Sequence, residues 1–186
     1  MPGLAANGKS EKGMQIKIAT EAQEFLEIHR LNYETFVEEI PQHAHNSQGQ
    51  LIDKFHHRNQ YIIATKNNRL IAMVCCNAER PFSLDARLDG LDNFLPPHGR
   101  LAEIRLLAVR SGERKTGVAY RLLQYLCQHL ILLGIDAAVI SATTRQLKLY
   151  AAMGFTPFGP LTGAPGAQFQ PMYITLNELR NDFRIR

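Results

Sequence analysis

The stretch from Ala102 to Ala119, AEIRLLAVRSGERKTGVA, is the feature that most constrains the fold of this chain. Its first part, Ile104 to Val109, is a nearly continuous apolar run, which is typical of a β-strand covered on both faces. A polar turn over residues 110–113 follows, and after Gly117 the apolar residues recur at helical spacing. The sequence therefore predicts a buried strand, a basic turn and a helix in direct succession.

The basic segment that opens this helix has the chemistry of an anion site. The first N–H groups of a helix lack partners inside the helix, and the helix dipole adds partial positive charge there. Gly117 and Ala119 keep the first turn small enough for a phosphate to reach the backbone, and Arg114 and Lys115 add full charges. We predict that a phosphate-bearing ligand is bound by Arg114, Lys115, Thr116, Gly117, Val118 and Ala119.

The chain then repeats the succession of strand and helix. Residues 135–142 form a β-type apolar run, and residues 143–155 read as a short helix closed by Gly154 and followed by Phe155. Counted from Val109, an arginine five residues on, a glycine eight on and a small residue ten on give the pattern R-x-x-G-x-A. The second segment carries Leu149-Tyr150, three further residues, and then Gly154-Phe155.

These two patterns resemble the signatures of the GNAT superfamily of N-acetyltransferases. The resemblance implies a loop that grips the pyrophosphate of coenzyme A, and acetyl-CoA or another acyl-CoA as co-substrate. It also implies that a backbone N–H of Leu107 or Ala108 stabilises the oxyanion of the reaction, with Leu107, Ala108 and Val109 lining the coenzyme.

The resemblance further implies two catalytic side chains. An alkyl amine titrates near pH ~10 and needs a base before it can attack a thioester, and Glu103 stands where many family members carry that glutamate. Tyr150 would protonate the departing thiolate. Structural alternatives remain for both: Glu103 pairing with Arg105 or Arg100, and Tyr150 serving as a core aromatic.

The first half of the chain adds looser motifs, which are Tyr33–Phe36, Asp53–His56, Tyr61–Ala64, and Arg80 ahead of Leu91 and Phe94. They resemble the acyl-homoserine lactone synthases and the long-chain N-acyl amino acid synthases, which take acyl groups from acyl carrier protein. Three positions depart from that pattern, with Asn32 in place of an arginine, His56 in place of an acid, and Arg105-Leu106 in place of Ser-Arg. The intact R-x-x-G-x-A pattern favours a free coenzyme donor, and acyl carrier protein remains the alternative partner.

Size and composition indicate one domain. The chain has 186 residues; we interpret 1–14 as a disordered leader and 15–186 as a single acyltransferase domain. Three cysteines without metal-type spacing indicate reduced thiols and a cytoplasmic location, and no apolar stretch approaches the roughly 20 residues of a membrane span. The net charge of +4 is dispersed, which argues against nucleic acid, and the histidines at 43, 45, 56 and 57 read as solvated loop residues without a metal site.

The remaining elements complete the fold prediction. We expect strands over 15–19, 61–65, 70–77 and 170–176, a helix from a Thr20–Gln23 capping box to about Ile40, and a short helix over 83–88. The expected fold is α/β (α+β), a GNAT-type mixed, mostly antiparallel central sheet with helices on both faces. The last strand and the tail containing Phe183 could support a homodimer.

The sequence thus predicts an N-acyltransferase that moves an acyl group from acyl-CoA to a primary amine on a small molecule. Two alternatives stay open, namely an N-acyl amino acid synthase that uses acyl carrier protein and a non-catalytic acyl-CoA-binding module. The acceptor pocket is expected from the loops at 41–50, 82–99 and 161–169.

Overall fold

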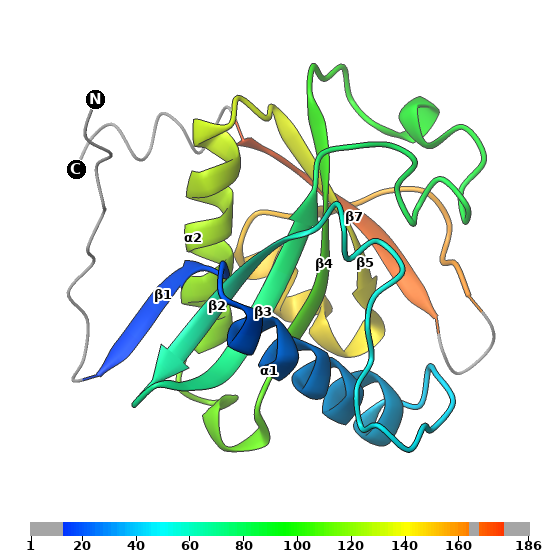
Figure 1. Cartoon of the computed structure of the whole chain (residues 1–186). Coiled ribbons are helices and arrows are strands. Elements are labelled where there is room, and N and C mark those ends of the chain that lie inside the picture. The colour runs from blue at the N-terminus through cyan, green and yellow to red at the C-terminus, as the bar shows by residue number, and fades with distance from the viewer. Residues whose placement is uncertain (1–12, 164–167, 177–186) are drawn as a thin grey trace.

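The computed structural model describes residues 13–163 and 168–176, and this part of the chain is built around one sheet (Figure 1). The sheet has seven strands in the order β1-β2-β3-β4-β5-β7-β6. The strands are β1 (Met14–Ile18), β2 (Gln60–Lys66), β3 (Arg69–Asn77), β4 (Leu101–Val109), β5 (Ala137–Thr143), β6 (Thr156–Pro157) and β7 (Phe169–Thr175). The helices are α1 (Ala22–Tyr33), the π-helix η1 (Glu34–Glu39), α2 (Val118–Leu132) and α3 (Leu147–Ala152), with short 3₁₀ turns η2 (Leu91–Phe94), η3 (Ser111–Glu113) and η4 (Thr144–Gln146).

Strand pairing confirms the predicted mixed sheet. β4 and β5 are parallel, and the other neighbouring strands pair antiparallel. The predicted strands over 61–65 and 70–77 correspond to β2 and β3, which form a hairpin through Asn67 and Asn68, whose φ angles are 50° and 58°. Asparagine tolerates this left-handed backbone better than most residues, which explains the pair of asparagines at the turn.

Helices cover both faces of the sheet. The buried leucines of α2, among them Leu122 and Leu126, pack with Ile104 and Ile140 on one face, and Tyr150 of α3 belongs to the same cluster. α1 packs on the other face, where Ile28 contributes to a separate cluster. The adjacent Cys75 and Cys76 fall into these two different clusters, so they point to opposite faces of β3.

An irregular segment over 78–100 covers the part of the sheet that α1 leaves open. Leu84 and Leu88 of this segment pack on Ala137 and Val139 of β5. Because side chains alternate along a strand, Val139 points away from the face that carries Ile140 and α2. The segment therefore shares a face with α1.

The predicted short helix over 83–88 is only a single turn. The N–H groups of Arg87 and Leu88 both donate to the carbonyl of Leu84. The preceding amides of Ser83 and Leu84 donate instead to the carboxylate of Glu103 on β4. These tertiary hydrogen bonds fix the turn against the sheet in place of a longer helix.

The first helix also departs from the prediction at both ends. The carboxylate of Glu24, rather than the side chain of Gln23, accepts the N–H groups of Thr20 and Glu21, and α1 begins at Ala22. Past Tyr33 the helix widens into the π-helix η1. The extra residue in each π turn rotates the positions that follow, and π segments occur often at functional sites.

Residues 1–12 of the predicted leader, the tail beyond Leu176 and its Phe183 lie outside the described residues. Met14 already belongs to β1, where it pairs with Lys66 of β2. Among the residues that the structure describes, no helix is long and apolar enough to cross a membrane.

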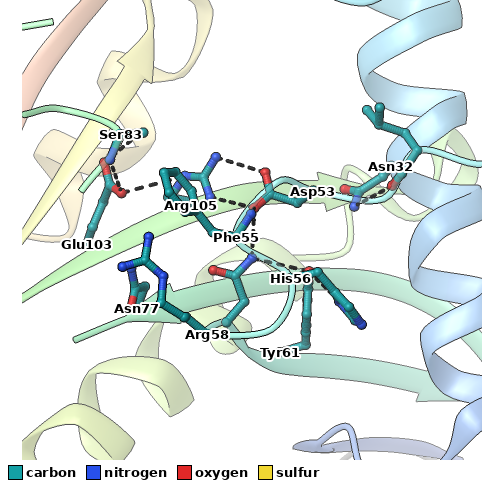
Figure 2. Close-up of polar contacts among 12 residues, drawn as sticks. Asn32, Asp53, Phe55, His56, Arg58, Tyr61, Asn77, Ser83, Glu103 and Arg105 are labelled. Carbon is teal, nitrogen blue, oxygen red and sulfur yellow. Dashed lines mark hydrogen bonds and ion pairs between the residues drawn. The ribbon is translucent and has the colours of Figure 1, made fainter. Parts of the chain in front are cut away.

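A buried ion pair fixes the segment before β2 to the middle of β4 (Figure 2). Both carboxylate oxygens of Asp53 accept hydrogen bonds from the guanidinium of Arg105, at 2.7 and 2.9 Å. The N–H of Phe55 and the side-chain amide of Asn59 donate to the same carboxylate, at 2.9 and 3.0 Å. The side chains of Asp53 and Arg105 are only 9% and 14% exposed, so water screens the pair weakly.

The surroundings of Asp53 hold its pKa below the ordinary value for an aspartate. Burial alone would raise this pKa, but the hydrogen bonds and charge of Arg105, with the donors Phe55 and Asn59, outweigh burial. A carboxyl with a lowered folded-state pKa stabilises the fold above its unfolded pKa of about 3.9, and loses that contribution as pH falls through the folded-state value.

We expect Asp53→Asn to lower the free energy of unfolding by about 3 kcal/mol near neutral pH, because it removes the two-bonded partner of Arg105 and leaves only the longer 3.6 Å contact with Glu103. In urea titrations, the difference from wild type should stay constant down to about pH 5 and shrink below about pH 4. Asp89→Asn alters an exposed carboxylate and serves as the control. A difference that does not change with pH would contradict the role given to the ion pair.

Candidate functional site

The site is organised by an irregularity in the middle of β4. Pairing between β4 and β5 ends at Ile104 and Ile140, although β4 continues to Val109 and β5 to Thr143. The register between β3 and β4 skips Leu106 and Leu107, and Leu106 has a φ of 57°. Such a conformation costs a non-glycine residue about 1–2 kcal/mol and is typical of a β-bulge that redirects a strand. β4 is thus detached from β5 over its C-terminal half.

A cavity of about 470 Å³ lies at this point of separation. Its floor comes from both strands, and its walls come from α1 and η1, the segment over 51–54, the turn after Ser83, and α3. The lining residues used below are Asn32, Asp53, Lys54, Ser83, Arg87, Arg105, Leu107, Ser141 and Tyr150.

Tyr150 is a buried tyrosine in the lining of the cavity. It is 5% exposed, its ring packs edge-on against Phe155, and it lines the cavity from α3. Burial raises the pKa of Tyr150 well above the ordinary value for tyrosine. The phenol therefore stays protonated at neutral pH. The structure thus combines both readings of this residue, a core aromatic and a group that faces a cavity.

Glu103 of β4 has no exposed surface and lies beside Ser83 (Figure 2). Its carboxylate accepts hydrogen bonds from Ser83 N at 2.8 Å, Ser83 Oγ at 2.6 Å and Leu84 N at 3.1 Å. Arg105 Nε lies 3.6 Å away, whereas Arg100 donates to Leu133 and Asp136 instead. Ser83 lines the cavity and links it to Glu103 through a short hydrogen bond.

The predicted anion segment lies at the exposed start of α2. Gly117, with a φ of 77°, is the N-cap, and no side chain caps the helix. Because glycine adopts this left-handed backbone without strain, the chain can turn directly into the helix. Val118 is buried in the core and Ala119 is partly buried, whereas Gly117 itself is exposed. The start of the helix is therefore open to solvent at Gly117.

The basic side chains beside this helix start already have partners inside the molecule or lie exposed. Arg114 Nε donates to the carbonyl of Val109 at 3.0 Å, and its guanidinium pairs with Glu39 of η1. Lys115 is exposed, and Thr116 Oγ1 donates to the carbonyl of Glu113 at 2.7 Å. A ligand anion would therefore compete with Glu39 for Arg114.

The oxyanion candidates on β4 differ in their position. Leu107 lines the cavity and belongs to the part of β4 that the register with β3 skips. Ala108 is buried and already pairs with Met73. Of the two, Leu107 is the one that lines the cavity.

The three loops predicted to form the acceptor pocket all contribute residues to the cavity, although the sequence did not identify those residues individually. Two of the predicted loops contribute, through His43 and Arg87 among others, and Phe169 joins them at the end of the third predicted loop. The sequence marked Asn32 only as a departure from the synthase pattern, and the structure places it fully buried on α1. A polar residue inside the apolar stripe of a helix was the available signal.

The histidines are not all solvated, as the sequence had suggested. His43, His45 and His57 are exposed, but the ring of His56 is partly buried, with Nδ1 3.1 Å from the hydroxyl of Tyr61. His29 meets His56 edge-on at 4.8 Å between ring centroids. Within residues 13–163 and 168–176, no group of three His, Cys, Asp or Glu side chains could hold a metal ion.

Solved structures with similar folds include several acyl-transferring proteins. BjaI, a CoA-dependent acyl-homoserine lactone synthase bound to SAM and isopentyl-CoA, has a TM-score of 0.73 at 17% identity, over 87% of this chain and 80% of its own. FeeM, an N-acyl amino acid synthase from uncultured soil microbes, gives 0.67 at 16%, over 90% and 93%. An acyl-CoA N-acyltransferase from Pseudomonas aeruginosa gives 0.58 at 17%, over 86% and 97%. At these identities the likeness shows a shared fold.

A comparison of the sequence with curated proteins finds no match. The model of the acetyltransferase (GNAT) family, however, matches residues 23–155, which run from α1 to the Gly-Phe pair after α3. This range contains the bulged strand, the uncapped helix start and Tyr150. The chain therefore belongs to the acetyltransferase (GNAT) family.

Proposed function

We propose that this protein is an acyl-CoA-dependent N-acyltransferase that acts on a primary amine in a ternary complex. One observation carries the proposal: β4 leaves β5 after Ile104, and a cavity lined by both strands and by Tyr150 lies at that point. The arm of coenzyme A would take the place of the missing strand pairing. Its pyrophosphate would meet the free N–H groups beside Gly117.

On the donor side, the residues suit the charge that develops during transfer. The acceptor nitrogen attacks the thioester carbonyl, the C–S bond breaks, and negative charge forms first on the carbonyl oxygen and then on sulfur. The Leu107 N–H would stabilise the first charge, since a placed backbone donor is worth about 10²–10³ in rate. Tyr150 would give its phenolic proton to the leaving sulfur.

On the acceptor side, we propose that Glu103 acts through Ser83. The carboxylate does not line the cavity, but Ser83 does, and the two are joined by the 2.6 Å hydrogen bond. A proton taken from the amine by the hydroxyl can pass to Glu103 along this bond. The same contacts fix the turn over 83–88, so the carboxylate would have both a structural and a chemical role.

A second candidate is transfer from acyl carrier protein. The observation that favours it is the ion pair between Arg114 and Glu39, which already occupies the arginine expected to bind pyrophosphate. A carrier protein presents a phosphopantetheine arm without that diphosphate, and so would not need to displace Glu39. A non-catalytic acyl-CoA-binding module is the third possibility. It would bind CoA without releasing thiol from acetyl-CoA, whereas the two enzymes would turn over.

We expect release of free thiol from acetyl-CoA in the presence of a panel of primary amines. Tyr150→Phe should lower kcat by about 10²-fold or more, and Ser83→Ala and Glu103→Gln should lower it as well, with melting temperatures recorded for each. Tyr120→Phe removes an exposed hydroxyl from α2 and is the matched control. Wild-type turnover in both Tyr150→Phe and Glu103→Gln would remove the assigned roles, and CoA binding without thiol release would favour the binding module.

The donor is tested by calorimetry with CoA. Arg114→Ala should weaken binding about tenfold or more, because it removes a charged partner of the pyrophosphate. Glu39→Gln should tighten binding a few-fold at low ionic strength, since the pair with Arg114 is surface-exposed and salt-screened, and the gain should fade in high salt.

Glu38→Gln changes the exposed neighbour of Glu39 and should leave CoA affinity unchanged. If Arg114→Ala binds CoA as tightly as wild type, the pyrophosphate does not meet this arginine. Transfer from acyl carrier protein then becomes the better account.

A further inference from the structure

The wall of the cavity carries an excess of positive charge. Its charged lining residues are Asp53, Lys54, Arg87 and Arg105. Asp53 and Arg105 neutralise each other through two hydrogen bonds. Within the described part of the chain, Lys54 and Arg87 form no ion pair with a carboxylate.

These two cations come from separate segments and are held in place by aromatic rings. Lys54 Nζ lies 4.8 Å from the centroid of the Phe55 ring, on the segment before β2. The guanidinium carbon of Arg87 lies 4.8 Å from the centroid of the Phe169 ring, at the start of β7. A cation that rests on a ring loses less freedom when it binds a ligand. Both are therefore prepared to receive an anion.

A buried acceptor atom in the same cavity also has no partner. Asn32 has no exposed surface, and its Oδ1 accepts no hydrogen bond within the described residues, while Nδ2 makes a long contact of 3.4 Å with the carbonyl of Leu51. Buried polar atoms are normally paired, because an unpaired one costs about 1–3 kcal/mol. A ligand N–H or O–H at this point would satisfy it.

Neither cation belongs to the segment expected to bind the coenzyme phosphates. That segment is the start of α2 with Arg114 and Lys115, and it does not line this cavity. The charge of Lys54 and Arg87 is therefore available to the other substrate. An amine with no acid group would bring only positive charge to a positive wall, which is unfavourable.

We propose that the acceptor of this enzyme is an amine that also carries an acidic group, in the simplest case a carboxylate. Lys54 and Arg87 bind the acidic group, and Asn32 Oδ1 accepts a hydrogen bond from a donor on the acceptor. The inference rests on the proposed function, because it names the substrate class of the same cavity. It makes Lys54 and Arg87 the residues that determine acceptor specificity.

The test compares amines in matched pairs that differ by one carboxylate, such as phenylalanine with phenethylamine and leucine with isopentylamine. Calorimetry in the presence of CoA gives affinity, and thiol release from acetyl-CoA gives turnover. The acid of at least one pair should bind about tenfold or more tighter than its neutral partner. Lys54→Met and Arg87→Met should each reduce this ratio, whereas Arg30→Met, which removes an exposed positive charge outside the cavity, should not.

Three results would overturn the inference. They are equal binding of acid and neutral amine in every pair, no binding of any acid, and a loss of CoA affinity in the two variants with the acid preference intact. Failure of the proposed function gives a different result. In that case acids would bind selectively, but no thiol would be released from acetyl-CoA. Acylation of neutral amines alone would instead retain the function and remove the inference.

Asn32→Leu separates binding from folding. Leucine fills the site without the unpaired oxygen, so the melting temperature should stay the same or rise, while affinity for the preferred acceptor falls about fivefold or more. A variant that melts as wild type and binds the acceptor equally well would show that Asn32 does not contact the ligand.

Discussion

A single residue with a left-handed backbone, in the middle of a buried strand, lies where the sheet opens into the cavity. Leu106, with a φ of 57°, interrupts the register of β4 with β3, and the pairing of β4 with β5 stops at Ile104. Strained backbone of this kind persists only where the surroundings fix it. Here buried helices on both faces hold the sheet, so β4 can bend without opening the core. The cavity exists because two parallel strands that should stay paired do not.

Polar side chains on one face of β4 hold two irregular segments, those around Asp53 and Ser83, beside the cavity. Glu103 and Arg105 are two residues apart, so both point to the face that α1 shares with the segment over 78–100. Glu103 anchors the turn at Ser83, and Arg105 anchors the segment at Asp53 (Figure 2). The carboxylates of Glu103 and Asp53 thus each fix one wall of the cavity. Removing either charge is therefore expected to destabilise the fold, whatever its chemical role.

The sequence predicted those parts of the fold that local pattern controls. The apolar run of β4, the hairpin with Asn67 and Asn68, and the glycine start of α2 all follow from residues close together in the chain. The sequence did not predict the π-helix, the bulge at Leu106 or the cap at Glu24. Hydrophobic periodicity shows which side of an element is buried, but not the exact hydrogen-bond register of its residues.

Compact motifs and loop positions around the cavity could be predicted from the sequence, but not the individual residues that the loops contribute. The R-x-x-G-x-A segment and Tyr150 belong to compact motifs; Tyr150 lines the cavity where β4 and β5 part, and Arg114 contacts the carbonyl of Val109 at the end of β4. The cavity wall that we propose for the acceptor joins Asn32, Lys54 and Arg87, which lie on three separate segments. The ion pair of Arg114 with Glu39 likewise joins residues 75 positions apart. Nothing in the local sequence marks such contacts, since they arise only when the chain folds.

The proposed function requires that the separated ends of β4 and β5 receive the arm of coenzyme A. A crystal structure of the protein with CoA tests this most directly. The account predicts continuous density for the pantetheine arm between the two strands beyond Ile104 and Ile140, with the sulfur beside Tyr150 and the pyrophosphate at Gly117. Density for the arm elsewhere on the molecule, or strands β4 and β5 paired to their ends in the crystal, would contradict it.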